Sequence, residues 1–413
     1  MYGIAFASLC AACNLLLGND AAEKLDGEPD ASSGSSGVGA SSGVGTSSGV
    51  GASSSGEVPD GSGSSGMPDG VRTFTVENAT ATFAGNPEAL ALRGNRLLVG
   101  DADYLASGGR KLGCAWLFDV TSAAPGEKIE PLTSPSSGDF GQIVALGPSG
   151  QIAIADPSND YLGMGNVAGD VTLTKYDVWT QHIALNNDTL ALDVVGTSVE
   201  LWNLSAVKVG YVSQGSSVTV TSVAINDAPV AVNDAQFWAF GTSVENGIHK
   251  QVLVYSSERI RPEPKLPPTT PQSLLKAFNA PGDVRNFGHT LAAKAGVLLI
   301  GATGSSYVSE QLSEQLTVLT PEVGEGTFGS SVAVCSANRV VIGAPGDPNA
   351  PATGAAYVYT RLGSNDWQNT TTLKPEGLNV KGFGTAVACD GNLVAVSAQE
   401  NGAGVVYVHT LVP

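Results

Sequence analysis

One short pattern recurs along this chain and limits what the chain can fold into. It consists of a Phe-Gly pair, a run of small and β-branched residues, a polar break, a second apolar run and a Gly-Ala-Pro end, as in FGSSVAVCSANRVVIGAP at 328–345. Recurrence at a fixed spacing of about 49 residues indicates a repeat architecture in which each unit packs on its neighbours. The other copies are clear at 287–302 and 383–398, partial at 140–157, and weak from about residues 88, 182 and 222, which gives seven units.

Each unit predicts four antiparallel strands. The polar break is a turn between two strands, since Asn, Asp and Gly favour tight turns between apolar runs. A third, often aromatic strand follows, as in GAAYVY at 354–359, and a fourth precedes the next unit, as in WQNTTTL at 367–373. Such blades, repeated in series, predict an all-β fold: a seven-bladed β-propeller of four-stranded antiparallel blades.

Each end of the repeat region holds an incomplete blade. The last unit offers strands at 384–389, 392–397 and 404–409, and the chain then stops without a fourth strand. The segment VRTFTV at 71–76 stands in a fourth-strand position, but no earlier unit exists for it. We therefore predict that 71–76 pairs antiparallel with 404–409, which would close the ring without an open strand edge.

The Phe-Gly pair combined with a Gly-Ala-Pro-like end makes the chain resemble the FG-GAP repeat proteins, which include the propellers of integrin α-chains and bacterial surface proteins of lipoprotein type. The resemblance covers residues 71–413 and is strongest in the units at 287, 328 and 383. It implies a β-propeller that serves as a binding module.

In many members of that family, a calcium loop of the form Asp-x-Asp-x-Asp-Gly follows the second strand, where carboxylates at alternate positions converge on a hard cation. The matching loops here, at 101–104, 156–160 and 347–351, do not complete the motif. Asp156, Asn159 and Asp160 come nearest and are weak calcium candidates, although a solvated turn is the favoured interpretation. We therefore expect no metal and no cofactor.

The charge of the chain narrows its partners. The 413 residues carry a formal net charge of −18, with 20 Lys and Arg against 38 Asp and Glu. This balance argues against nucleic-acid binding and against electrostatic docking on anionic lipid, both of which need clustered cations.

The N-terminal part predicts an anchor and a tether. An apolar run at 4–12 ends in small residues before Cys13 and resembles the end of a bacterial lipoprotein signal, with Cys13 as the lipid-bearing residue. The alternative is an ordinary N-terminal segment with two stray cysteines. We expect a signal segment at 1–13, a disordered acidic and Ser/Gly-rich tether at 14–66, and the propeller at 67–413. The expected location is the cell envelope, as an outer-membrane lipoprotein facing outside or the periplasm and held to the membrane by its lipid alone.

Two further cysteines, Cys335 and Cys389, fall at nearly equivalent places in two units. A disulfide between them is possible, but buried free thiols are the favoured expectation. The five tryptophans are expected to pack between blades rather than to form a sugar-stacking platform. The four histidines show no metal-ligand spacing, and packing or surface roles are expected for them: His182, His249, His289 and His409.

We interpret the chain as a non-catalytic cell-surface module that binds an unknown protein or glycan partner through loops on one face. The alternatives are a propeller-type hydrolase or lyase, or a purely structural envelope protein. An enzyme would be indicated by Asp and Glu at the channel-facing starts of the inner strands. The expected starts carry Gln142, His289, Ser330 and Thr385, which does not favour an enzyme.

Overall fold

The structure is a computed structural model, and all the residues that it describes belong to one compact unit, Met67–Pro413. The predicted signal segment and tether, with Cys13, lie outside the described residues. The backbone of 71–74 is described without its side chains. The other described ranges are 87–122, 124, 126–132, 137–167, 172–194, 198–206, 208–213, 218–227, 236–244, 251–256, 274–321, 327–346, 354–375 and 379–412.

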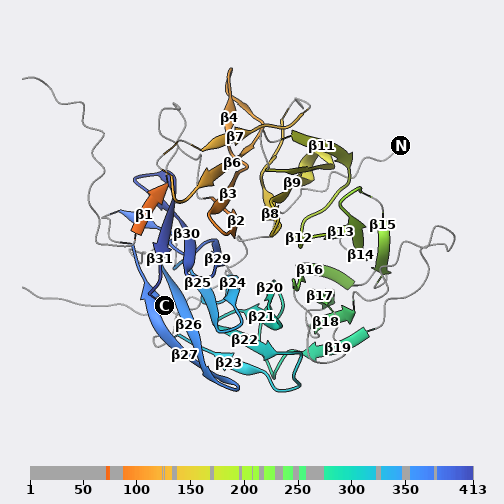
Figure 1. Ribbon diagram of the computed structural model, residues 1–413, viewed down its shortest axis with the longest axis vertical. Helices are drawn as coiled ribbons and strands as arrows, with labels where there is room; N and C mark the ends of the chain where they lie inside the picture. Colours follow the sequence, from red (N-terminus) through yellow and green to blue (C-terminus); the bar gives the residue numbers. More distant parts are fainter. Residues whose placement is uncertain are drawn as a thin grey trace, which may run out of the picture. The chain divides into compact units, whose positions relative to one another are not determined.

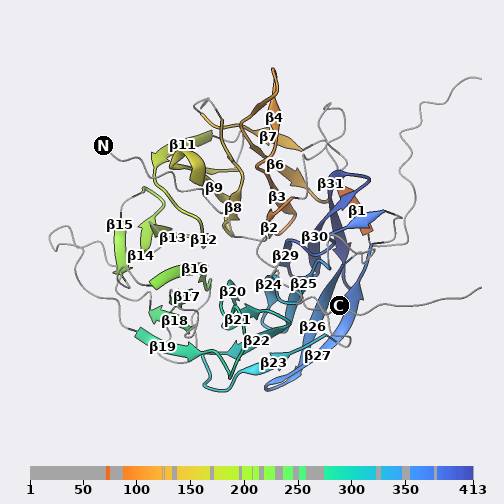
Figure 2. The ribbon, with the colours of Figure 1, turned by 180° about the vertical axis from the view of Figure 1, so that it is seen from behind.

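Seven antiparallel sheets stand around a common axis, which confirms the predicted seven-bladed β-propeller (Figures 1 and 2). In the first six blades, the strands follow one another outward from the axis in chain order. The first blade comprises β2 (Ala89–Arg93), β3 (Arg96–Asp101), β6 (Cys114–Asp119) and β7 (Glu127–Ile129). The second comprises β8 (Ile143–Leu146), β9 (Gln151–Asp156), β10 (Tyr161–Asn166) and β11 (Thr172–Asp177). The third comprises β12 (Ile183–Leu185), β13 (Thr189–Val194), β14 (Ser198–Asn203) and β15 (Lys208–Ser213).

The remaining blades continue the same arrangement. The fourth comprises β16 (Val218–Ile225), β17 (Phe237–Val244), β18 (Gln251–Ser256) and β19 (Leu274–Asn279). The fifth comprises β20 (Thr290–Lys294), β21 (Val297–Ala302), β22 (Ser305–Glu310) and β23 (Thr317–Leu319). The sixth comprises β24 (Ser331–Ser336), β25 (Arg339–Ala344), β26 (Ala355–Gly363) and β27 (Asp366–Leu373). The seventh comprises β29 (Val387–Asp390), β30 (Leu393–Glu400), β31 (Ala403–Thr410) and β1 (Val71–Phe74), and the short β28 (Val380–Lys381) also pairs with β30.

The seventh blade is built from both ends of the repeat region, as predicted. β1 pairs antiparallel with β31, with Val71 opposite His409 and Phe74 opposite Val406. The first strand of the propeller thus completes its last blade, and β31 is left without an open edge.

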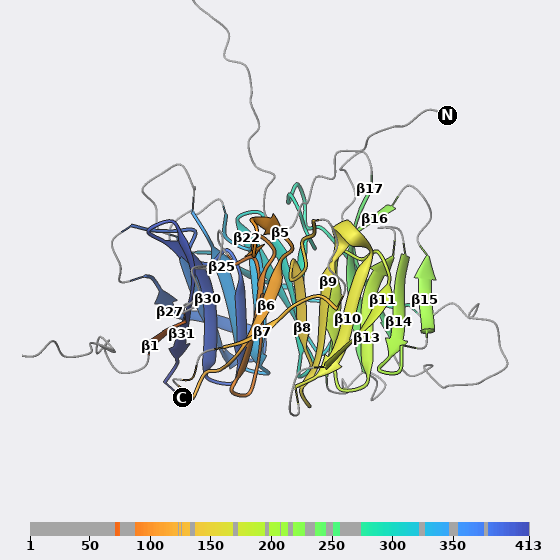
Figure 3. The same cartoon turned by 90° about the horizontal axis from the view of Figure 1, so that it is seen from above.

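The two faces of the ring differ in what they carry (Figure 3). We call the face on which the inner strands begin the Phe-Gly face, because Phe-Gly pairs precede β8, β20, β24 and β29 there. The opposite face, which carries the turns between the first and second strands of each blade, is the turn face. A two-stranded hairpin, β4 (Leu105–Ala106) with β5 (Arg110–Lys111), projects from the Phe-Gly face of the first blade.

The phenylalanines of the repeat lie in the joints between blades. Each is at most 1% exposed and contacts a tyrosine of the third strand of its own blade, with ring centroids 5.3–5.5 Å apart. This contact explains why the third strand of these units is aromatic. The pairs are Phe140 with Tyr161, Phe287 with Tyr307, Phe328 with Tyr357, and Phe383 with Tyr407.

The glycines of the repeat bring neighbouring blades into backbone contact. Gly384, at a φ of +97°, donates its N–H to Ser397 of its own blade at 3.0 Å, and its carbonyl accepts from Ser331 of the preceding blade at 2.8 Å. A Cβ on Gly343, at the end of the second strand of that blade, would overlap the carbonyl oxygen of Gly384. The same glycine-to-glycine contact recurs at three more joints: Gly100 with Gly141, Gly241 with Gly288, and Gly301 with Gly329.

Buried tryptophans pack between blades, as expected. Trp116 lies in the core between the first and seventh blades, Trp238 between the third and fourth, and Trp367 between the fifth and sixth. The indole N–H of Trp367 donates to Glu310 at 2.8 Å. Trp202 is partly buried against the core between the second and third blades.

The expectation of free thiols at Cys335 and Cys389 is wrong. The two residues form a disulfide between β24 and β29, the inner strands of the sixth and seventh blades, with their Cα atoms 4.9 Å apart. Adjacent inner strands run side by side at this distance, so equivalent positions in consecutive repeats are within bridging reach. Cys114 is a buried free thiol, and burial raises its pKa well above the usual range.

Candidate functional site

The axis of the ring holds a narrow channel. Its cavity has a volume of about 210 Å³ and is lined by residues of all seven inner strands. The lining residues are Ala, Val, Leu and Ile except for Arg93, Lys294 and Cys389. The inner strands have neighbours on one side only, so their free backbone edges also face the channel.

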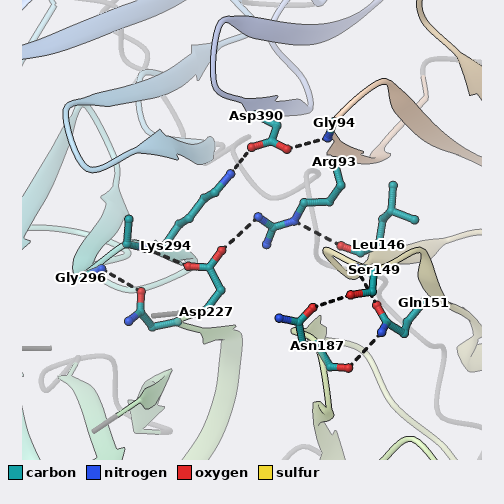
Figure 4. A network of polar contacts seen from close by, with 12 residues as sticks. Arg93, Gly94, Leu146, Ser149, Gln151, Asn187, Asp227, Lys294, Gly296 and Asp390 are labelled. Atoms are coloured by element: carbon teal, nitrogen blue, oxygen red, sulfur yellow. Dashed lines mark hydrogen bonds and ion pairs between the residues drawn. The ribbon is translucent and has the colours of Figure 1, made fainter. Parts of the chain in front are cut away.

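Charged side chains gather at the turn-face mouth of this channel (Figure 4). Arg93, at the end of β2, contacts Asp227 of the fourth blade at 3.4 Å and donates to the carbonyl of Leu146 at 3.4 Å. Lys294, at the end of β20, pairs with Asp390 of the seventh blade. Each of the four side chains is at most 26% exposed, so both ion pairs are largely shielded from water.

Backbone amides join the two ion pairs into one circuit. The carboxylate of Asp390 accepts from the N–H of Gly94 at 2.6 Å, and that of Asp227 accepts from the N–H of Ala295 at 3.0 Å. Gly94 follows Arg93 and Ala295 follows Lys294 in the chain. Each carboxylate therefore contacts the side chain of one cation and the backbone amide that follows the other cation, and the contacts form a closed loop. We call this set of contacts among Arg93, Asp227, Lys294 and Asp390 the mouth circuit.

The environment of Asp390 favours its charged form. Burial alone opposes ionisation, but the Gly94 amide, the Lys294 ammonium and the Arg93 guanidinium outweigh it and hold the pKa of Asp390 below its usual range. Asp390 is therefore held in its charged form beside Lys294, and the mouth circuit as a whole contains two acidic and two basic side chains.

The predicted starts of the inner strands lie at the Phe-Gly face. Thr385 is buried and its hydroxyl donates to the carbonyl of Gly382 at 2.8 Å, while Nδ1 of His289 lies 2.9 Å from the carbonyl oxygen of Asn286. Gln142 and Ser330 are partly buried. These polar groups come from different blades: Thr385 and His289 contact their own loops, whereas the Ser330 hydroxyl is buried and has no hydrogen-bond partner among the described residues.

The sequence analysis missed one acidic residue at the start of an inner strand. Glu88 directly precedes β2, and together with Asp101, Asp103 and Gln142 it lines a pocket of about 30 Å³ on the Phe-Gly face. Partial loss of water around the carboxyl and the nearby charge of Asp103 raise the pKa of Glu88. The weak repeat at this place, EALAL without a Phe-Gly pair, gave no reason to treat Glu88 as a strand start.

The calcium candidates Asp156, Asn159 and Asp160 lie together in the short 3₁₀ turn after β9, η1 (Pro157–Asn159). The carboxylate of Asp156 accepts from the Ser158 N–H at 3.0 Å and from the Asn159 amide at 2.8 Å. Burial raises the pKa of Asp156. Within the described ranges, no set of three or more His, Cys, Asp or Glu side chains is placed to hold a metal ion; the candidate loop at 347–351 lies outside them.

The histidines occupy unlike surroundings. His182 contacts the buried carboxylate of Asp193 through Nδ1 at 3.3 Å. His409 is 9% exposed, and burial lowers its pKa to about 4. His249 lies outside the described residues. None of the described helices is long and apolar enough to cross a membrane.

Comparisons with known proteins agree with the geometry. Residues 315–359 match the family model of the FG-GAP repeat, a segment that runs from β23 of the fifth blade through three strands of the sixth and contains Phe328-Gly329. No curated protein sequence matches the chain.

Solved structures are similar in fold. A chain of the mitotic checkpoint complex is similar with a TM-score of 0.53 and 10% identity, over 84% of this chain and 96% of that one. Virginiamycin B lyase from Staphylococcus aureus is similar with a TM-score of 0.50 and 8% identity, over 83% of this chain and 99% of that one. At these identities the likeness shows the fold alone.

The ring and its axial channel define the class of this protein as a seven-bladed β-propeller. Within that class, it is a propeller that carries the FG-GAP repeat, whose Phe and Gly residues form the joints between blades.

Proposed function

We propose that this protein is a non-catalytic cell-surface lipoprotein whose propeller binds a protein or glycan partner. The observation that carries the proposal is the composition of the axial channel. Its described lining is aliphatic apart from one disulfide sulfur and two cations, and both cations are engaged by carboxylates. General acid–base or nucleophilic catalysis needs a titratable or nucleophilic group free to reach a substrate.

The rival function, a hydrolase or lyase, would have to use the Phe-Gly face around Glu88. The pocket there has a volume of about 30 Å³, which accommodates one or two water molecules rather than a substrate. A purely structural role is the second rival, and it predicts that no ligand binds saturably.

A location outside the cytoplasm is supported by the disulfide. Disulfides persist in oxidising compartments such as the periplasm and the cell surface, and Cys335–Cys389 joins two inner strands of the core. The lipid anchor at Cys13 can be tested separately. Metabolic labelling with palmitate should mark the full-length protein but not a Cys13→Ala variant, and equal labelling of both would remove the anchor from the proposal.

The Phe-Gly face is favoured as the binding face. It carries the projecting β4–β5 hairpin, on which Leu105 is 53% exposed, whereas the turn-face mouth is occupied by the mouth circuit. Exposed apolar side chains on projecting loops are frequent anchors in protein interfaces.

Capture of envelope components on immobilised 67–413 tests the binding function. Binding should saturate, and it should be competed by the free domain. A Leu105→Asp variant should weaken capture about tenfold, as expected for an interface anchor. A Leu274→Asp variant is the matched control, because Leu274 is equally exposed at 52% but lies on β19 at the outer wall. Equal loss in both variants would argue against the Phe-Gly face, and absence of saturable capture would favour the structural role.

A further inference from the structure

The mouth circuit and the disulfide share one hairpin, formed by β29, β30 and the turn between them. Cys389 and Asp390 are consecutive residues at the end of β29. Cys389 is bonded to Cys335, and the N–H of Gly391 donates to the carbonyl of Cys335 at 3.1 Å. The turn is thus held against the sixth blade by one covalent bond and one hydrogen bond, both within two residues of Asp390.

From this position, Asp390 is the group that connects the seventh blade to the rest of the mouth. One carboxylate oxygen accepts from Gly94 of the first blade, and the other contacts Lys294 of the fifth (Figure 4). The first and fifth blades are not neighbours in the ring, so Asp390 spans the mouth. A carboxylate that must satisfy two partners on separate blades needs a fixed backbone, because its charge-assisted hydrogen bonds require defined distances and angles.

We propose that the Cys335–Cys389 disulfide is a redox-sensitive latch of the turn-face mouth: oxidised, it holds Asp390 in the mouth circuit; reduced, it releases the turn and opens the channel at this face. Cys389 is among the residues that line the channel and is 7% exposed, so the axis is the route by which a small dithiol would reach the disulfide. The dithiol supplies two electrons and two protons. The S–S bond breaks, both sulfurs become thiols, and the reductant is oxidised to its own disulfide.

Release of Asp390 from the mouth circuit is feasible because water can replace the contacts that the carboxylate and Lys294 lose. Lys294 and Asp390 are 14% and 26% exposed, so both can regain water when the turn moves outward. The second ion pair, Arg93 with Asp227, has its own anchor in the Ala295 amide and remains in place. The switch is therefore local to the seventh blade and does not require the ring to unfold. It is independent of the proposed binding function.

The coupling must act in both directions. If the oxidised disulfide stabilises the mouth circuit, then the mouth circuit stabilises the disulfide by the same factor in the equilibrium constant. Weakening the contacts of Asp390 should therefore make the disulfide easier to reduce, although neither Asp390 nor Lys294 contains sulfur.

Hydrogen exchange on the full-length protein tests the forward direction. After mild treatment with dithiothreitol under native conditions, peptide mass spectrometry should confirm free thiols at Cys335 and Cys389. Amide exchange at Gly94 should then be about tenfold faster, because local opening exposes its N–H, while exchange in β26 and β27 stays the same. Free thiols at both positions with unchanged exchange at Gly94 would overturn the proposal.

The equilibrium of reduction tests the reverse direction without removing a cysteine. In buffers with defined ratios of reduced to oxidised dithiothreitol, the equilibrium constant for reduction should be about tenfold larger in Asp390→Asn and Lys294→Met than in the unaltered protein, by the reciprocity of coupled equilibria. Lys276→Met is the matched control, since Lys276 pairs with Glu314 on the outer wall at 3.0 Å. Each variant is first compared by its far-ultraviolet circular dichroism and melting temperature, so that global loosening is recognised. Folded Asp390→Asn and Lys294→Met proteins with the same equilibrium constant as Lys276→Met would contradict the latch.

Discussion

Gly384 in the seventh blade and Thr180 in the third occupy equivalent places in their repeats. Each lies three residues before the first residue of its inner strand, which is β29 or β12. At Gly384 the absence of a side chain brings the backbones of two blades together. Thr180 carries a side chain and is nevertheless fully buried, because its hydroxyl donates to the carboxylate of Asp193 at 2.8 Å. Asp193 in turn stands where the sixth blade has Gly343.

Thr180 and Asp193 both belong to the third blade, so this contact ties the entry of the blade to its own second strand, whereas the glycine contact joins two blades. Asp193 is 0% exposed and also accepts from the N–H groups of Gln181 and His182 at 2.8 and 2.7 Å. Burial would raise its pKa, but these hydrogen bonds and the His182 ring outweigh it and hold the pKa below the usual range. The glycine joint between blades depends on size and does not titrate, whereas the carboxylate contact within the third blade accommodates a side chain and depends on ionisation.

The largest effect is expected from a side chain in a glycine joint. Gly384→Ala should destabilise the domain by about 4 kcal/mol, because the position has a positive φ and its Cβ would overlap the carbonyl oxygen of Ala355. Thr180→Ala should cost about 2 kcal/mol, the value of one hydrogen bond to a charged group. Urea unfolding of both variants measures the difference. Similar losses in the two would show that the two places do not differ in their tolerance of size.

Removal of the carboxylate should be the next largest effect. Asp193→Ala leaves buried N–H and O–H donors without their acceptor and should cost about 3 kcal/mol. Asp177→Ala serves as the control, since the Asp177 side chain is 83% exposed and pairs with Lys175 on the surface. A loss below about 1 kcal/mol for Asp193→Ala would mean that water replaces the carboxylate.

The stability of the seventh blade, which contains His409, and that of the third blade, which contains Asp193, should also respond to acid in different ranges of pH. The pKa of His409 in the folded protein is about 4, below its ordinary value of 6.5. The unfolded chain therefore binds this proton first, and stability falls as the pH decreases from about 6.5 to 4, by about 2 kcal/mol at pH 5. The contribution of Asp193, whose folded pKa is lowered, is lost only below about pH 3.8. Urea unfolding at pH 7 and pH 5 should show the loss in the natural protein and not in His409→Leu; an equal loss in both would contradict this assignment.

A smaller effect is expected from the hydroxyl that supports a glycine joint. Ser331→Ala removes the hydrogen bond to the Gly384 carbonyl at 2.8 Å and should cost about 1 kcal/mol. In the neighbouring joint, Thr290 donates to the Gly329 carbonyl at 3.1 Å, and Thr290→Ser keeps the hydroxyl. Thermal unfolding should therefore place Thr290→Ser closer to the unaltered protein than Ser331→Ala, and the reverse order would show that the methyl group matters more than the hydrogen bond.

The smallest effect is expected from calcium. The melting temperature in EDTA should equal that in millimolar calcium, because the loops that match the family's calcium motif lack its full set of acids. A ligand at 100 times its dissociation constant would add about 2.7 kcal/mol, which a melting curve detects. An upward shift that is abolished by Asp156→Asn would identify a site at the second blade.

The sequence was sufficient for the ring because the repeat is periodic and physically consistent. The Phe-Gly units predicted the number of blades and the order of the strands. The strand that each end of the repeat region lacks predicted the pairing of 71–76 with β31. It was insufficient for the mouth circuit. Arg93 and Asp227 are 134 positions apart, and they are brought together by the curvature of the whole ring rather than by any local pattern. The disulfide was misjudged for a similar reason: equivalent positions in consecutive units are far apart in the sequence and adjacent at the axis.

The pairing of β1 with β31 has a consequence for the order in which the protein can be made. β1 is among the first parts of the propeller to leave the ribosome, yet its hydrogen-bonding partner, residues 403–410, is among the last. Six blades can form as the chain emerges, but the seventh has to wait until residues 403–410 have been made. Until then β1 is unpaired and exposed to association with other chains. A chain that is cut short before β31 therefore cannot close the ring.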